Sequence, residues 1–206
     1  FFDGDQFGFN PTAKFKLSDA TVLDLSYEYI DQERFIDRGI PTGTDGRPVR
    51  ALRNNVFGDP LLNTTELEAN LFKAMVQHRF SDAMKGNFSV FYGDYEKMYQ
   101  NFYAAKYDQS KTPNEVTLDG YVDTTQRENL QISGNVIAEL QTGIATHTLL
   151  FGLEVIDTTS DQDRFNTYFD TSESDKENFS ISAGLPLALV GGRGTNSAGQ
   201  ATVNDF

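Results

Sequence analysis

The chain of 206 residues contains no cysteine and no tryptophan. Without cysteine it can form neither a disulfide framework nor a thiolate centre. It also lacks any run of about 18 apolar residues, the length that indicates a transmembrane helix. Its only histidines, His78 and His147, lie near different predicted turns. We therefore interpret them as structural residues rather than as ligands of a shared metal ion.

Basic residues are outnumbered, with 17 Lys and Arg against 30 Asp and Glu, and the formal net charge is −13. This balance excludes nucleic acid as a partner, because phosphates need a basic surface. The sequence also lacks a Ser–His–Asp order, a glycine-rich phosphate cradle and a metalloprotease motif, so an enzyme is not supported. Asp157, Asp161 and Asp163 are spaced like calcium-loop ligands, but the glycine and the closing glutamate are missing. We interpret them as a solvated loop.

What the chain does have is aromatic residues and alternation. Aromatics make up 13% of the residues, whereas the hydrophobic fraction is only 38%. The clearest alternation runs through Leu130–Gln141, where apolar residues occupy every second position. Ile137 is the single apolar residue at the intervening polar positions. A turn around Gly143 and a second strand, Leu149–Ile156, follow. Strands of soluble proteins usually span about 5–6 residues, and a tilted bilayer crossing needs roughly 9–11. The hairpin therefore predicts a membrane β-barrel.

The same pattern of strand, short turn, strand and long loop occurs three times. Short turns are centred near Asp19, Asp82 and Gly143. The remaining predicted strands are Phe7–Leu17, Leu23–Ile30, Thr65–Phe80 with a bulge near Leu71, a strand from Phe88, and Val116–Val122. The predicted long loops are Asp31–Asn63, Asn101–Glu115 and Asp157–Phe206, the last with a possible strand at Phe179–Leu189. Short turns at one end and long loops at the other are typical of outer-membrane barrels.

Four motifs occur in order along the chain. DRGIP, at Asp37–Pro41, follows the strand LDLSYEYID at Leu23–Asp31, and VFGDP lies at Val56–Pro60. VQHRFSD lies at Val76–Asp82, and GIATHTLLFGLE lies at Gly143–Glu154. In this order they resemble loop and barrel segments of TonB-dependent siderophore receptors of the bacterial outer membrane. The resemblance extends from about Phe7 to Arg164. It implies a barrel of about 22 strands closed around a plug.

The expected fold class is therefore all-β, an antiparallel transmembrane β-barrel segment of about six strands from that larger barrel. Residues 1–206 would form a partial barrel domain, with the plug domain and the remaining strands absent from the sequence. The resemblance implies a ferric siderophore as the transported ligand and no covalently bound cofactor. It also implies contact with the TonB complex through the plug, and with outer-membrane lipid and lipopolysaccharide around the wall.

Two groups of residues are candidate ligand contacts. Arg47, Arg50 and Arg53 lie three apart in the first loop after a possible helix cap at Asp45. On one helical turn they would face the same way and could meet an anionic ferric chelate; the alternative is a solvated basic loop. The second group comprises Tyr99, Phe102, Tyr103 and Tyr107, preceded by Tyr95. Such rings can stack on a flat ligand, although a membrane-interface girdle is the favoured interpretation for Tyr95 and Tyr99.

Two other classes of protein stay open at this point. One is a different outer-membrane barrel, such as a porin or a receptor for cobalamin or a sugar. The other is a soluble secreted β-sandwich that binds carbohydrate, which predicts strands of about six residues.

Overall fold

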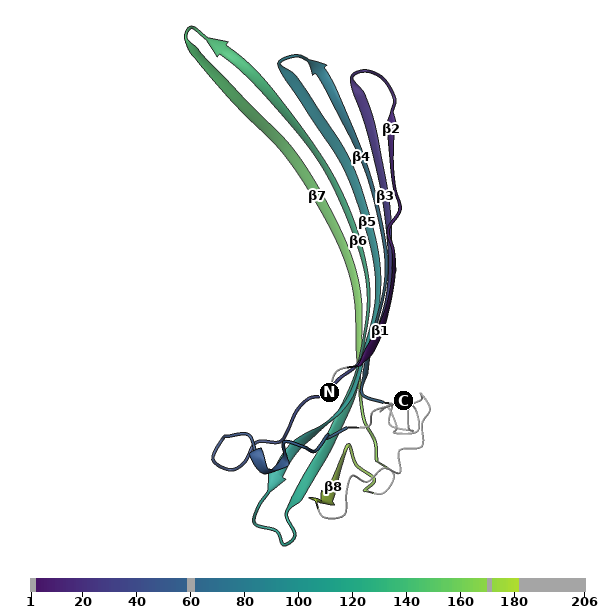
Figure 1. Cartoon of the computed structure of the whole chain (residues 1–206), viewed down its shortest axis with the longest axis vertical. Coiled ribbons are helices and arrows are strands. Elements are labelled where there is room, and N and C mark those ends of the chain that lie inside the picture. Colours follow the sequence, from purple (N-terminus) through teal and green to yellow (C-terminus); the bar gives the residue numbers. More distant parts are fainter. Residues whose placement is uncertain (1–2, 59–61, 170–171, 182–206) are drawn as a thin grey trace.

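A computed structural model describes residues 3–58, 62–169 and 172–181 (Figure 1). These residues form one antiparallel sheet and a single short 3-10 helix. The elements are β1 (Gly4–Phe9), β2 (Thr12–Lys16), β3 (Thr21–Phe35), η1 (Arg50–Leu52), β4 (Thr64–Ser81), β5 (Met84–Asp108), β6 (Glu115–Thr142), β7 (Ala145–Asn166) and β8 (Lys176–Ser180). Among the described residues, no helix is long and apolar enough to cross a membrane.

The strands follow one another in chain order across the sheet, β1-β3-β4-β5-β6-β7, with β2 also paired to β3 and β8 paired to β6. β1 and β2 share one register against β3, with Phe9 opposite Tyr29 and Thr12 opposite Ser26. They are therefore a single strand position, interrupted at Pro11, which has no backbone N–H to donate. The sheet thus contains the expected six long strand positions, with short turns at one end and longer connections at the other (Figure 1).

The registers assign every paired side chain to one of two faces, because directly opposed residues lie on the same side of a sheet. One face, here called the outer face, carries apolar rows such as Leu25, Ala74, Val90, Ile132 and Val155. The opposite face, here called the inner face, carries mostly polar rows, such as the one with Asp24, Ser89, Ser133 and Glu154, in which Met75 is the apolar exception. The alternation predicted from the sequence is confirmed.

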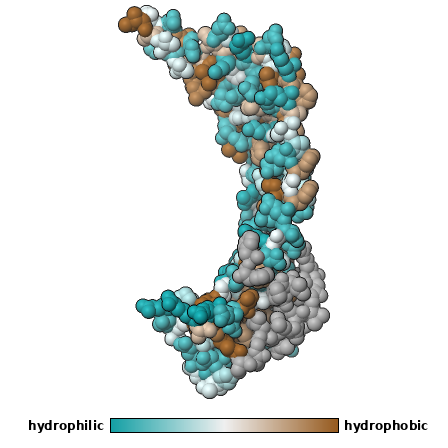
Figure 2. Space-filling model, viewed as in Figure 1, coloured by the Kyte–Doolittle hydropathy of each residue, from teal (hydrophilic) through white to brown (hydrophobic). Residues whose placement is uncertain are grey.

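Among the described residues, no second layer covers the apolar rows. Phe88 is 51% exposed, Leu153 is 70% exposed and Phe151 is 75% exposed. Figure 2 shows hydrophobic side chains lying open on the sheet among hydrophilic ones. A β-sandwich would face these rows with another sheet, and the described residues form only one. The soluble sandwich is therefore the wrong alternative for this part of the chain.

The strands extend well past the predicted ends. β3 continues to Phe35 and β7 to Asn166, so the first and third loops begin later than predicted at Asp31 and Asp157. The predicted loop Asn101–Glu115 is wrong over most of its length, because β5 runs to Asp108 and only residues 109–114 connect it to β6. Directly beyond the apolar rows the outer face turns acidic, with Asp31, Glu68, Glu96 and Asp161, so hydrophobic alternation is interrupted while backbone pairing continues. The predicted strand at Phe179–Leu189 overlaps the end of β8, and residues 182–189 lie outside the described residues.

The bulge predicted near Leu71 is absent. β4 pairs with β3 in one unbroken register, and its irregularity against β5 falls between Arg79 and Ser81. The change of phase has a different cause, because both faces of β4 are apolar at this point. Leu71 and Ala69 lie on the inner face, and Ala69 is only 1% exposed.

The loop end of the sheet has its own small hydrophobic core, to which the connection between β3 and β4 contributes. Its buried members are Leu52, Phe57, Phe102, Tyr107, Val116, Leu118, Phe169 and Phe179. Next to this core, the side chain of Asn63 makes hydrogen bonds to β5 like those of a neighbouring strand backbone. Its Nδ2 donates to the Phe102 carbonyl at 2.8 Å, and its Oδ1 accepts from the Phe102 N–H at 3.0 Å. β4 begins at Thr64, so the side chain of Asn63 supplies hydrogen bonds to β5 just beyond the end of β4.

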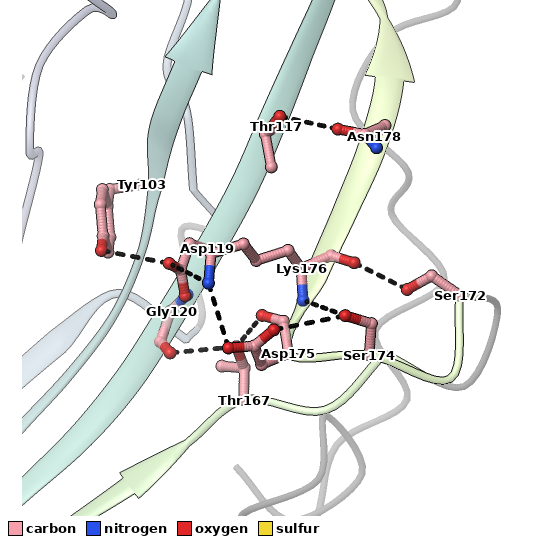
Figure 3. Close-up of polar contacts among 10 residues, drawn as sticks. All are labelled: Tyr103, Thr117, Asp119, Gly120, Thr167, Ser172, Ser174, Asp175, Lys176 and Asn178. Carbon is pink, nitrogen blue, oxygen red and sulfur yellow. Dashed lines mark hydrogen bonds and ion pairs between the residues drawn. The ribbon is translucent and has the colours of Figure 1, made fainter.

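The segment after β7 is tied to β6 by polar contacts (Figure 3). The buried hydroxyl of Thr167 donates to the Gly120 carbonyl at 3.0 Å, and Lys176 forms an ion pair with Asp119 at 3.4 Å. Thr117 donates to Asn178 at 2.7 Å. A side chain at position 120 would clash with Phe102 and Thr167 at 2.7 Å, so only glycine allows this close approach.

Replacing Asn63 with Ala should reveal how much its two hydrogen bonds to the Phe102 backbone contribute. The Phe102 N–H loses an acceptor in a buried site, a loss that costs about 1–3 kcal/mol. We expect amide hydrogen exchange at Phe102 to accelerate by about tenfold or more in the full-length protein. Asn178→Ala is the control, because Asn178 is exposed and accepts its hydrogen bond at the surface. Equal exchange rates at Phe102 in both variants would contradict this role of Asn63.

Candidate ligand-binding site at the loop end of the inner face

Three tyrosines meet where β5 and β6 leave the main sheet. Tyr99 and Tyr103 share the inner face of β5, four residues apart, and Tyr121 lies beside them on β6. The Tyr121 ring stacks on Tyr99 with centroids 6.1 Å apart, and it meets the edge of Tyr103 at 6.2 Å. The period of two along each strand places these rings on one face.

Two arginines flank this aromatic group. The Arg38 guanidinium lies 4.8 Å from the Tyr103 ring centre and donates to Asn101 Oδ1 at 2.9 Å and to the Tyr121 hydroxyl at 2.8 Å. The Arg164 guanidinium lies 4.4 Å from the Tyr121 ring centre. Arg164 also forms a two-pronged ion pair with Asp123, with both contacts at 2.5 Å. Tyr121 therefore contacts both arginines. We call Arg38, Tyr99, Tyr103, Tyr121 and Arg164 the arginine–tyrosine site.

Nearby carboxylates set the charge of this site. The hydrogen bonds that Arg164 donates to Asp123, together with the negative charge of that carboxylate, raise the pKa of Arg164, so its guanidinium stays charged. Burial raises the pKa of Tyr103, and the Asp119 carboxylate raises it further. Tyr103 is therefore a neutral phenol at physiological pH, and its hydroxyl donates to Asp119 at 3.4 Å. Asp119 also forms the ion pair with Lys176 of β8 (Figure 3), so it connects the arginine–tyrosine site to β8.

The arrangement suits a flat anionic ligand. Asp123 neutralises Arg164, whereas Arg38 has no carboxylate partner among the described residues. Arg38 and Arg164 are both exposed despite their contacts, so their charges face solvent. Aromatic rings and guanidinium planes can stack on a conjugated ligand while the positive charge attracts its negative groups. Within the described ranges no three His, Asp or Glu side chains gather in a way that could hold a metal ion.

The predicted aromatic group is divided between two environments. Tyr99 and Tyr103 belong to the arginine–tyrosine site, and Tyr95 lies on the same face further along β5. Phe102 is 0% exposed and Tyr107 is buried, both in the loop core. The Tyr107 hydroxyl accepts from Asn114 at 2.7 Å. Alternation turns Phe102 to the outer face, and the irregularity between Ala104 and Lys106 turns Tyr107 to that face too. Their contact with a ligand stays a prediction, and their position is that of packing residues.

The predicted arginine triplet does not share a helical turn. η1 spans only Arg50–Leu52, with Arg53 just after it and Arg47 before it. Asp45 does not cap η1; its carboxylate accepts from the Arg47 N–H at 3.1 Å and closes a turn. Arg47, Arg50 and Arg53 are exposed and form no ion pair with the rest of the described chain. Contact of this triplet with a ligand also stays a prediction.

The sequence did not single out Arg38, Tyr121 or Arg164 as site residues. Arg38 stands inside the DRGIP segment, which suggested only a resemblance, and the last two residues of VFGDP lie outside the described residues. Tyr121 and Asp123 do alternate with Val122, a pattern that could have placed them on one face. Their meeting with Arg38 depends on a strand register and a loop path that no local pattern encodes.

Comparison with solved structures identifies the class of fold. The ferric-catecholate import receptor Fiu of E. coli K12 matches with a TM-score of 0.65 and 18% identity over 76% of this chain and 27% of that one. FpvA of P. aeruginosa, solved with pyoverdine and iron, matches with a TM-score of 0.73 and 13% identity over 84% of this chain and 24% of that one. BauA, the ferric preacinetobactin receptor of Acinetobacter baumannii, matches with a TM-score of 0.62 and 11% identity over 87% and 26%.

No protein-family model matches the sequence, and no curated protein matches it. The solved structures show that the chain has the fold of a segment of an antiparallel β-barrel wall, as in these three receptors. It spans about a quarter of their length.

Removing the Arg38 side chain should loosen the loop between β3 and β4. Arg38→Ala deletes two hydrogen bonds and a stacked guanidinium, and we expect a loss of about 1 kcal/mol of local stability, or about fivefold in the open population. Trypsin should then cleave after Arg50 or Arg53 about fivefold faster. Arg34→Ala is the control, because Arg34 is exposed and lacks an ion pair within the described chain. Unchanged cleavage in Arg38→Ala would contradict this role.

Proposed function

We propose that this chain is part of the wall of a bacterial outer-membrane receptor that imports a ferric siderophore through TonB-dependent transport. The observation that carries the proposal is the arginine–tyrosine site, which lies at the loop end of the inner face. A ligand arriving from the loop side would meet Arg38 and Tyr121 before it reached the rest of the inner face. The barrel-wall fold shared with Fiu, FpvA and BauA supports this reading.

The strands fit a bilayer crossing in length and in pattern. β4 to β7 contain 18, 25, 28 and 22 residues, more than the roughly 9–11 needed to cross. The exposed apolar rows of the outer face would contact lipid, with Tyr27, Phe72, Tyr92 and Leu130 forming the row next to the acidic part of the strands. Lipopolysaccharide would surround the wall towards its loop end. These contacts are part of the proposal.

The rest of the receptor would supply the coupling. In the proposed mechanism the described segment binds and positions the chelate, and a plug elsewhere in the protein relays energy from the TonB complex. The chain would act by binding and transport rather than by bond-making chemistry. The ferric ion would travel within its chelate as cargo.

The ligand class follows from the charges and rings of the site. Arg38, which has no carboxylate partner among the described residues, lies beside three tyrosines and favours a chelate with negative charge and aromatic rings. A ferric tris-catecholate fits this description better than an uncharged ferric tris-hydroxamate. This chemistry agrees with the ligand named for Fiu, although the identity to Fiu is low and the preference rests on the residues of this chain.

Binding of the two chelates by the purified full-length receptor tests the proposal. We expect wild type to prefer the trianionic tris-catecholate, and Arg38→Ala and Tyr121→Ala each to weaken its binding by about tenfold. Tyr121→Phe should lose less, because it keeps the ring. Lys16→Ala is the control, since Lys16 is far from the site and pairs with Asp19 at 2.7 Å. A companion variant, Arg53→Ala, tests the arginine triplet. Failure of wild type to bind either chelate would contradict the proposed function.

A further inference from the structure

Charge is divided between the two faces of the sheet. Every Lys and Arg at a paired strand position lies on the inner face, including Lys73, Lys97, Arg127 and Arg164. The outer face carries acidic residues instead, among them Asp31, Glu68, Glu96, Glu128 and Asp161. In a chain with a net charge of −13, the inner face therefore carries all of these cations, together with carboxylates such as Asp24, Asp123 and Glu154.

Two of these cations lie next to each other without a counter-ion. Lys97 is directly opposite Thr125 and Arg127 is directly opposite Tyr95, so the two charged side chains are diagonal neighbours on one face. Both are exposed, and neither forms an ion pair with any described residue. Arg127 reaches only the Ser160 hydroxyl, at 3.5 Å. The two positive charges repel each other, and an anion bound between them would attract both and offset that repulsion.

The same two cations line a hollow in the inner face. Its volume is about 460 Å³, and its other lining residues are Leu67, Tyr95, Thr125, Asn129 and Gln162. These side chains supply an aromatic ring, a hydroxyl and two amides besides the positive charges. The set is chemically similar to the arginine–tyrosine site, where tyrosines, an amide and guanidinium groups meet.

The hollow begins where the arginine–tyrosine site ends. Lys97 is two residues from Tyr99 on the same face of β5, and Gln162 is two residues from Arg164 on the same face of β7. A ligand that left the first site along the inner face would therefore reach Lys97 and Arg127 next. Asp123, the acidic side chain on the inner face between Tyr121 and Thr125, is already bound to Arg164.

We propose that this hollow is a second binding subsite for the anionic chelate, one step further along the inner face from the arginine–tyrosine site. Lys97 and Arg127 contact negative oxygens of the chelate, and Tyr95 packs against one of its rings. Asn129 and Gln162 donate hydrogen bonds to it. This inference rests on the proposed function, because it assigns a deeper position to the same ligand.

The test compares two double variants of the full-length receptor. Lys97→Gln with Arg127→Gln removes the two charges of the hollow. The control, Lys73→Gln with Lys85→Gln, removes two exposed inner-face charges outside it that likewise form no ion pair with the described residues. The probes are a trianionic ferric tris-catecholate and an uncharged ferric tris-hydroxamate, each titrated at low and high salt.

We expect the first double variant to bind the tris-catecholate about tenfold more weakly at low salt, and the control to change by less than about twofold. Binding of the uncharged chelate should stay the same in both. Equal weakening in the two double variants would overturn the subsite, because it would reflect only the general field of the inner face. Equal weakening of both chelates together with a lower melting temperature would also overturn it, because the pair would then be supporting the fold.

Failure of the subsite can be told apart from failure of the proposed function. If Tyr121→Ala weakens binding of the tris-catecholate and the Lys97 and Arg127 double variant does not, the proposed function stands and the second subsite is contradicted. If wild-type receptor binds neither chelate, both proposals fall together.

Discussion

Continuous antiparallel pairing of long strands is the constraint on which this structure depends. β3 pairs with β4 without a break, and β5 pairs with β6 over almost all of their 25 and 28 residues. An unbroken register fixes the face of every side chain, since a slip of one residue would exchange the two faces. The apolar rows, the acidic outer end and the cationic inner face all follow from that single geometric rule.

The same rule builds the candidate site and also limits it. Alternation brings Tyr99 and Tyr103 to the inner face and sends Phe102 into the loop core between them. The loop core, closed by Asn63, then holds the chain that carries Arg38 against the rings of the inner face. The packed loop core on one side of the hairpin and the candidate site on the other are therefore two consequences of the same stretch of β5.

The sequence was sufficient where one face was apolar. Leu130–Ile156 and Leu23–Ile30 showed their strands because hydrophobic residues recur every second position, and Gly143, at φ 61°, marked a two-residue turn. It was insufficient beyond the apolar rows, where Asp157–Asn166 looks like a polar loop and is held as a strand only by its pairing with β6. The site was harder still, because Arg38 and Tyr121 are 83 residues apart and only the folded sheet brings them together.

The central claim is that the outer face contacts lipid and the inner face contacts water. Because these 206 residues contain no cysteine, a single cysteine substitution gives one labelling site within them and can report on one face at a time. Spin labels at Ser89→Cys and Val90→Cys in the full-length protein, reconstituted in bilayers, are the most direct measurement. The label at position 90 should be accessible to oxygen, and the label at position 89 to a water-soluble nickel chelate. Equal access of the nickel chelate to both labels would contradict a membrane-embedded wall.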